Sequence, residues 1–238
     1  MVGRRWFTLI FNQLVTPDFF LFHMSEILEV DWSLPEPSPI ARAAELLRQG
    51  QVIAIPTDTF YGLAANPFDL SAVERVFSIK DRLKGNPILL LVDSIRMASE
   101  LSVDLPLQFY RLAGRFWPGP LTMVVKASAS LPSLVTAHTG WIGLRIPAAP
   151  VPLALIRATQ FPLTATSANI SGERDSSSAQ QVERALGERV PLILDAGTSR
   201  SDKPSTVLKL NGETWEILRE GVIPRTEIAD FLGAESVR

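Results

Sequence analysis

The sequence predicts an α/β fold, in which a twisted, mixed sheet carries packed helices. Short apolar segments alternate along the chain with amphipathic segments that have helical spacing. In the second half of the chain the apolar segments follow one another closely, which favours a mixed sheet over a purely parallel one. The length of 238 residues suits one large domain with a sizeable core.

The expected elements run from residue 38 to residue 232. Ser38 and Pro39 are typical of a helix start, and Gly50 of a helix end. Ser71 and Glu74 have the spacing of a capping box, which predicts a helix to about residue 80. Further helices are expected at 107–117, 152–159, 180–186 and 227–232. Strands are expected at 52–55, 87–92, 121–125, 141–146, 162–166, 191–194, 206–210 and 215–218.

The composition excludes several classes of site. There is no cysteine, so disulfides, zinc–thiolate sites, iron–sulfur clusters and cysteine nucleophiles are ruled out. His23 and His138 are the only histidines, which rules out a multi-histidine metal site and a histidine-dependent triad. The formal net charge of -2 provides no global positive field, so a polyanion would need a local cluster of cations.

The amino-terminal segment combines Arg4 and Arg5 with two apolar stretches, which gives it the look of a secretory signal. Polar residues interrupt it and no small-residue cleavage site follows. We expect residues 1–30 to be an extension, either disordered or upstream of a true start at Met24, and residues 31–238 to form the domain. No other segment is apolar over a bilayer-spanning length, so we expect a cytoplasmic protein without membrane contact.

A polar turn and a pair of cations form the first candidate site. Thr57, Asp58 and Thr59 lie just beyond the expected strand that ends at Ile55, where α/β proteins bind ligands. Lys80 and Arg82 stand two residues apart and suit phosphate groups. Two alternatives stay open: the hydroxyls could cap a turn, and the cations could complement a helix dipole.

A second set of polar side chains follows the expected strand 162–166. Ser167 and Asn169 flank Ala168 and share a side if the chain is extended, although such residues are also common in turns. Arg145 lies inside an apolar strand and needs a partner, either an internal carboxylate or a ligand carboxylate. Arg219, at the end of another strand, raises the same question.

Taken together, these motifs resemble those of the YrdC-like family of threonylcarbamoyl-AMP synthases, in its short, single-domain form. The resemblance covers roughly residues 36–224. Leu83 and Leu91 depart from it, because the family usually has proline and often histidine there. The matching motifs, in order along the chain, are Pro56–Leu63, Lys80-x-Arg82, Asn86-Pro87, Pro118–Thr122, Leu144–Pro147, Ser167–Gly172, Pro204–Val207 and Ile217–Gly221.

The resemblance implies an enzyme that condenses L-threonine, bicarbonate and ATP to threonylcarbamoyl-AMP and pyrophosphate. It also implies a large central cavity, Mg²⁺ bound with ATP and no resident metal site. A threonylcarbamoyl-transferase complex would use the product to modify tRNA, and tRNA or double-stranded RNA is a further expected partner. The alternative is a YrdC-like paralogue that binds a nucleotide or double-stranded RNA without this activity.

The resemblance also implies roles for individual residues. Lys80 and Arg82 would hold the triphosphate as the catalytic residues, because catalysis would consist of positioning and charge neutralisation. Arg145 would bind the carboxylate of threonine. The implied threonine-binding residues are Thr59, Arg145, Ser167 and Ser205, and the implied ATP-binding residues are Lys80, Arg82, Asn86, Asn169, Ser177 and Arg219.

Overall fold

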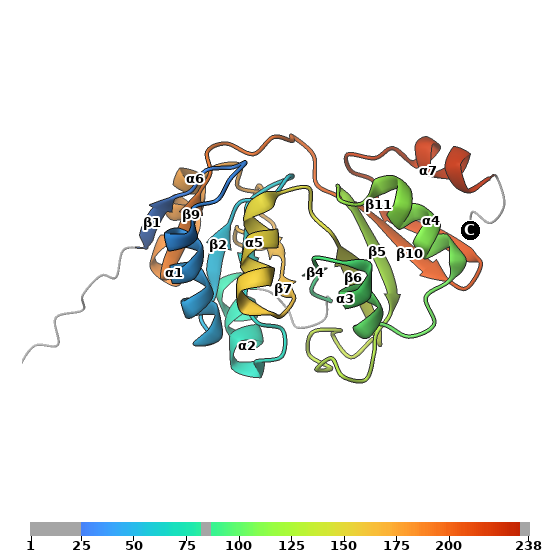
Figure 1. Cartoon of the computed structure of the whole chain (residues 1–238), viewed down its shortest axis with the longest axis horizontal. Coiled ribbons are helices and arrows are strands. Elements are labelled where there is room, and N and C mark those ends of the chain that lie inside the picture. Colours follow the sequence, from blue (N-terminus) through green and yellow to red (C-terminus); the bar gives the residue numbers. More distant parts are fainter. Residues whose placement is uncertain (1–24, 82–86, 234–238) are drawn as a thin grey trace, which may run out of the picture.

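The computed structural model describes residues 25–81 and 87–233. Its strands form two mixed sheets where the sequence predicted one (Figure 1). The first sheet has the order β1-β9-β2-β3-β8, with β1 at Glu26–Glu29, β9 at Leu192–Asp195, β2 at Ile53–Ile55, β3 at Gly62–Ala64 and β8 at Thr166–Ser167. The second has the order β11-β10-β5-β6-β4-β7, with β11 at Thr214–Arg219, β10 at Thr206–Asn211, β5 at Leu121–Lys126, β6 at Trp141–Arg145, β4 at Leu90–Leu91 and β7 at Leu163–Thr164.

The chain passes from one sheet to the other at Ala165. Before it, β7 pairs antiparallel with β4 of the six-stranded sheet; after it, β8 pairs antiparallel with β3 of the five-stranded sheet. The single strand predicted at 162–166 is therefore two short strands. An apolar run predicts that a strand is buried, but it does not predict which neighbouring strand pairs with it.

Seven α-helices lie within the described residues, and they confirm the mixed α/β class. Their bounds are α1 Pro37–Arg48, α2 Leu70–Ile79, α3 Ile95–Glu100, α4 Leu107–Phe116, α5 Pro150–Thr159, α6 Ala179–Leu186 and α7 Arg225–Leu232. A short 3₁₀ helix, η1 at Gly187–Arg189, follows α6. Helix α1 packs against α5 beside the five-stranded sheet, whereas α4 and α7 lie at the opposite end of the molecule over the six-stranded sheet (Figure 1).

The two helix starts predicted from capping residues were wrong. Helix α1 begins at Pro37 and its N-cap is Glu36, so Ser38 is already inside the helix. Helix α2 is capped by Asp69, whose carboxylate accepts hydrogen bonds from the backbone N–H groups of Ser71 (2.9 Å) and Ala72 (3.3 Å). The capping box was placed two residues too late because Asp and Ser are equally good N-caps.

The expected extension 1–30 contains the first strand. Strand β1 pairs in parallel with β9, and the hydroxyl of Ser25 donates to the carbonyl of Val190 at 2.7 Å. The acidic residues at both ends of this segment, Glu26 and Glu29, concealed a strand whose neighbour lies far away in the sequence. Residues 1–23 lie outside the described residues.

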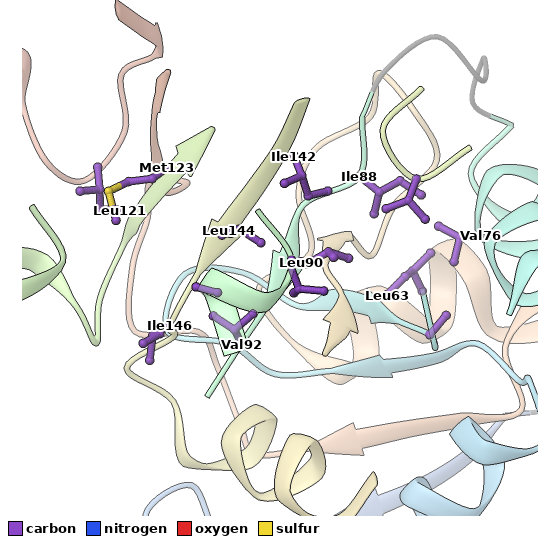
Figure 2. Packing of buried hydrophobic residues seen from close by; sticks show 14 of the residues in the cluster. Leu63, Val76, Ile88, Leu90, Val92, Leu121, Met123, Ile142, Leu144 and Ile146 are labelled. Carbon is purple, nitrogen blue, oxygen red and sulfur yellow. The ribbon is translucent and has the colours of Figure 1, made fainter. Parts of the chain in front are cut away.

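The largest cluster of buried side chains joins the two sheets. Figure 2 shows Leu63 of β3 near Leu90 of β4, with Leu144 of β6 and Met123 of β5 farther along the same cluster. The side chains of strand β5 point alternately to the two faces of the sheet. Leu121, Met123 and Val125 enter this core, while residues 122 and 124 face the other way. That opposite face of the six-stranded sheet is left for a site. None of the described helices is long and apolar enough to cross a bilayer.

Candidate active site

The polar residues that follow the strands gather around one pocket of about 800 Å³. Both sheets contribute to its walls, the five-stranded one through β3 and β8 and the six-stranded one through β5, β6, β10 and β11. Seven of the residues predicted from the sequence line it: Thr59, Lys80, Arg145, Ser167, Asn169, Ser205 and Arg219. Arg82 and Asn86 lie outside the described residues.

Arg145 lines the pocket and is held by three contacts with the protein. It is 3% exposed. Its Nε donates to the carbonyl of Gly119 at 2.9 Å and its Nη1 to the hydroxyl of Thr59 at 3.1 Å. Its Nη2 forms an ion pair with Oδ1 of Asp58 at 2.6 Å. The internal carboxylate considered for this buried arginine is therefore present, and it is Asp58.

The two threonines of the turn form a chain of hydroxyls with a defined direction. The hydroxyl of Thr57 donates its single proton to the carbonyl of Phe60 at 2.6 Å. The 3.1 Å contact between the Thr57 and Thr59 hydroxyls must then use the proton of Thr59. Since Arg145 donates to the same Thr59 oxygen, this oxygen has one acceptor lone pair left and no proton to give.

Lys80 occupies the C-cap of α2 and is 3% exposed. Its ammonium donates to the carbonyl of Ser167, to the carbonyl of Asn169 at 2.8 Å and to Oδ1 of Asn169 at 2.8 Å. The Ser167 hydroxyl donates to that same Oδ1 at 2.7 Å. The lysine that the sequence assigned to phosphate binding thus also fixes the segment that follows β8.

Arg219, on the last strand, bends back over β10. Its Nη2 donates to the carbonyl of Ser205 at 2.9 Å, and the Ser205 hydroxyl lies 2.9 Å from that of Thr122. Burial lowers the pKa of the Arg219 guanidinium, the carboxylate of Asp175 opposes this shift, and the nearby charge of Arg145 adds to it. Two arginines therefore direct positive charge into the same pocket.

Ser177, the remaining predicted ATP contact, lies in an adjoining pocket of about 830 Å³. The two pockets share part of their walls: Phe60, Glu173 and Asp175. The Ser177 side chain contacts Gln181 of α6, 3.2 Å away. The structure thus places Ser177 in a pocket apart from the other predicted residues, next to the pocket that they line.

Sequence reasoning did not assign Thr122, Ser171, Glu173 and Asp175 to the site, although all four line the pocket. The sequence pattern does indicate Thr122, because it is the only polar residue between Leu121 and Val125 and must therefore face away from the core side of the strand. No sequence pattern indicates Glu173 and Asp175, since both lie in an irregular loop. Among the residues described, no three His, Asp or Glu side chains come together as a metal-binding group.

Comparison with known proteins decides the family. The family model described as telomere recombination, Sua5/YciO/YrdC, matches residues 45–221, which is more than half of the chain. The chain belongs to the Sua5/YciO/YrdC family. This confirms the resemblance inferred from the ordered motifs, and it also confirms the YrdC-like fold.

Two curated relatives of the family show how much of the chain is shared. A threonylcarbamoyl-AMP synthase of Pyrococcus abyssi is 37% identical over 191 residues, which are 80% of this chain and 56% of the relative. One of Bacillus subtilis is 33% identical over 234 residues, 98% of this chain and 62% of the relative. The chain therefore spans 56% and 62% of the length of these two relatives.

A solved structure of the family has the same fold. The crystal structure of P. abyssi Sua5 complexed with L-threonine superposes with a TM-score of 0.86 at 35% identity, and covers 90% of this chain and 63% of the Sua5 chain.

Proposed function

We propose that this chain is an L-threonylcarbamoyladenylate synthase, a nucleotidyltransferase that uses L-threonine, bicarbonate and ATP. The observation that carries the proposal is the pocket itself, in which Lys80, Arg145 and Arg219 are brought together with a set of hydroxyls. The membership of the chain in the Sua5/YciO/YrdC family and the names of the two relatives support the choice of substrates.

The products define which bonds have to form. The threonine amine adds to bicarbonate with loss of water, which gives a carbamate. A carbamate oxygen then attacks the α-phosphorus of ATP, and the bond from that phosphorus to the β-phosphate bridging oxygen breaks to release pyrophosphate. Both steps join anions, so positive charge and exact placement are what the protein has to supply.

The part of the pocket that Arg145 lines suits the α-amino acid. Arg145 would bind its carboxylate, with Ser167 and Ser205 close by in the pocket wall. Thr59 has only an acceptor lone pair to offer, so it would receive a hydrogen bond from the threonine amine and could not donate one to the carboxylate. Such a contact would turn the nitrogen lone pair toward the incoming carbon.

The triphosphate would lie nearer Lys80 and Arg219, together with Arg82 and Asn86. Because Asn169 and Ser167 already accept hydrogen bonds from the Lys80 ammonium, its contribution would be charge and the placement of Asn169. Phe60 lines both pockets, and we infer that ATP extends past it into the adjoining pocket, where Ser177 would contact its nucleoside. Mg²⁺ would enter with ATP as part of the substrate.

The partners outside the pocket follow from the product. A threonylcarbamoyl-transferase complex would take the reactive acyl adenylate to tRNA, and this places the chain in the cytoplasm. Direct contact with tRNA or double-stranded RNA is a further part of the proposal. A net charge of -2 predicts that such binding is weak, with little dependence on salt, and a salt titration of RNA affinity measures this.

The decisive experiment follows pyrophosphate release by the purified protein in the presence of ATP, bicarbonate and threonine. We expect release that requires both threonine and bicarbonate, with threonylcarbamoyl-AMP identified by mass spectrometry. Release that is indifferent to threonine would rule out the proposed function.

Two variants test the phosphate-binding assignment. Lys80→Ala and Arg82→Ala should each lower kcat/KM by about 100-fold, because each removes charge from the transferring phosphate. Arg96→Ala is the matched control, since Arg96 is an exposed cation on α3 that forms a surface ion pair with Glu100. Melting curves of all three variants separate lost catalysis from lost folding, and a fully active Lys80 or Arg82 variant contradicts the assignment.

A further inference from the structure

Asp58 is a partly buried carboxylate for which the proposed reaction has no use. Its side chain is 11% exposed, and its Oδ1 lies 2.6 Å from Nη2 of Arg145. Its neighbours Thr57, Thr59 and Phe60 all line the pocket, but Asp58 lines neither this pocket nor the adjoining one. Asp58 therefore lies behind Arg145, away from the space that a substrate would fill.

The guanidinium of Arg145 is planar and carries five N–H donors in a rigid fork. Three of its contacts are with the protein: Gly119, Thr59 and Asp58. Among the described residues, the second N–H of Nη1 has no protein acceptor, and Arg145 lines the pocket. Asp58 is the only anion among the three protein partners, so its charge, 2.6 Å from Nη2, restrains how the plane of the fork is turned.

We propose that Asp58 is a positioning residue that sets the orientation of Arg145 and, through it, the pocket end that receives the amino acid. The proposal rests on the proposed function, in which Arg145 binds the threonine carboxylate. The carboxylate of Asp58 neutralises Arg145 while the pocket is empty and holds its Nη1 toward the pocket when threonine enters. Through the bond from Arg145 to Thr59, it also keeps the Thr59 lone pair turned toward the amine.

An opposite role can be distinguished from this one. If Asp58 occupied the place of the substrate carboxylate, the two would compete for Arg145, and removal of Asp58 would tighten threonine binding. The position of Asp58 outside the pocket lining argues for support from behind. The two roles predict opposite signs for the change in threonine affinity.

The test measures threonine binding by calorimetry without ATP, and then KM for threonine and for ATP in the pyrophosphate assay. In Asp58→Ala the threonine Kd and KM should rise by about 10- to 100-fold, the range seen when an outer partner that orients a ligand-binding group is removed. In Asp58→Asn, which keeps an oxygen facing Nη2, the rise should be smaller, about threefold to tenfold. The KM for ATP should stay unchanged in both.

Glu227→Gln is the matched control, because it neutralises a carboxylate that pairs with Arg115 on the surface, far from the pocket lining. It should bind threonine like the wild type. Loss of Asp58 also leaves a buried cation without its partner, so melting curves are recorded for each variant. If Asp58→Ala does not fold, the isosteric Asp58→Asn carries the same comparison.

A double-mutant cycle completes the test. If Asp58 acts through Arg145, adding Asp58→Ala to Arg145→Ala changes the threonine Kd no further. An additional loss in that background, an unchanged Kd in folded Asp58→Asn, or tighter threonine binding in either single variant would each overturn the proposal. Failure of the wild type to bind threonine at all would instead reject the proposed function on which it rests.

Discussion

At the scale of single residues, the site depends on groups whose partners lie far away in the sequence. Arg145 was recognised from the sequence as a charge that needs a partner, but the choice between an internal and a ligand carboxylate stayed open until Asp58 was seen beside it. Gly119, read as part of a helix stop, supplies the carbonyl for the Nε of Arg145. A Cβ on Gly119 would lie 2.5 Å from the carbonyl oxygen of Phe116, so only glycine fits.

Thr57 provides a residue-scale prediction. In Thr57→Val the carbonyl of Phe60 loses its donor in a partly buried place, and the Thr59 hydroxyl loses its acceptor in a buried one. We expect the free energy of unfolding to fall by about 1–3 kcal/mol, the usual cost of such unsatisfied groups, and KM for threonine to rise.

Thr57→Ser is the control, because it keeps the hydroxyl and removes one methyl group, which costs about 0.8 kcal/mol. Urea denaturation and steady-state kinetics give both quantities. Equal stability and equal KM in the Val and Ser variants would refute the directional chain of hydroxyls.

At the scale of elements, helix α2 places Lys80 at the pocket because specific residues fix where the helix begins and where it ends. Asp69 caps the first turn, and Lys80 is the C-cap at the other end. Local sequence signals predicted this helix and its end near residue 80. They misplaced its first residue, since several capping residues stand close together there and only the three-dimensional hydrogen bonds distinguish them.

Asp69→Ala should lower the free energy of unfolding by about 1 kcal/mol at pH 7, because it removes the cap of α2. Asp69→Asn, an equally good N-cap, should leave it nearly unchanged. The hydrogen bond from Ser71 is the main cause that lowers the pKa of Asp69 below its usual 3.8. A carboxyl whose folded pKa is lowered stabilises the protein above its unfolded pKa, and this contribution is lost as the pH falls through the lowered value.

The destabilisation by Asp69→Ala should therefore shrink when urea denaturation is repeated at about pH 3. A wild-type stability of Asp69→Ala at pH 7 would show that the cap contributes nothing.

At the scale of the whole molecule, the pocket exists because the chain changes sheets at Ala165. Strand β7 belongs to one sheet and β8 to the other, so Ser167 and Asn169 are delivered from the five-stranded sheet to face Arg145, Ser205 and Arg219. No single element contains the site. It is the space between two sheets that this crossing brings together.

The amino-terminal boundary gives a prediction at this scale. Deleting residues 1–23 should leave the melting temperature and the activity nearly unchanged, because β1 begins only at Glu26. Deleting residues 1–30 also removes β1 and the buried Val30, which should lower the free energy of unfolding by about 2 kcal/mol or more. Thermal melts of both truncations check this, and equal stability of the two would contradict the contribution of β1.

The sequence by itself determined the α/β class, most of the helices and strands, and seven of the polar residues that gather in the pocket. These depend on local periodicity, turn chemistry and a few ordered motifs, all of which can be read within short windows. Only the tertiary structure decided that there are two sheets, that Asp58 pairs with Arg145 and that Lys80 holds Asn169. The physical reason is distance along the chain: these contacts join residues more than 80 positions apart, and the path that brings them together depends on the packing of the entire chain.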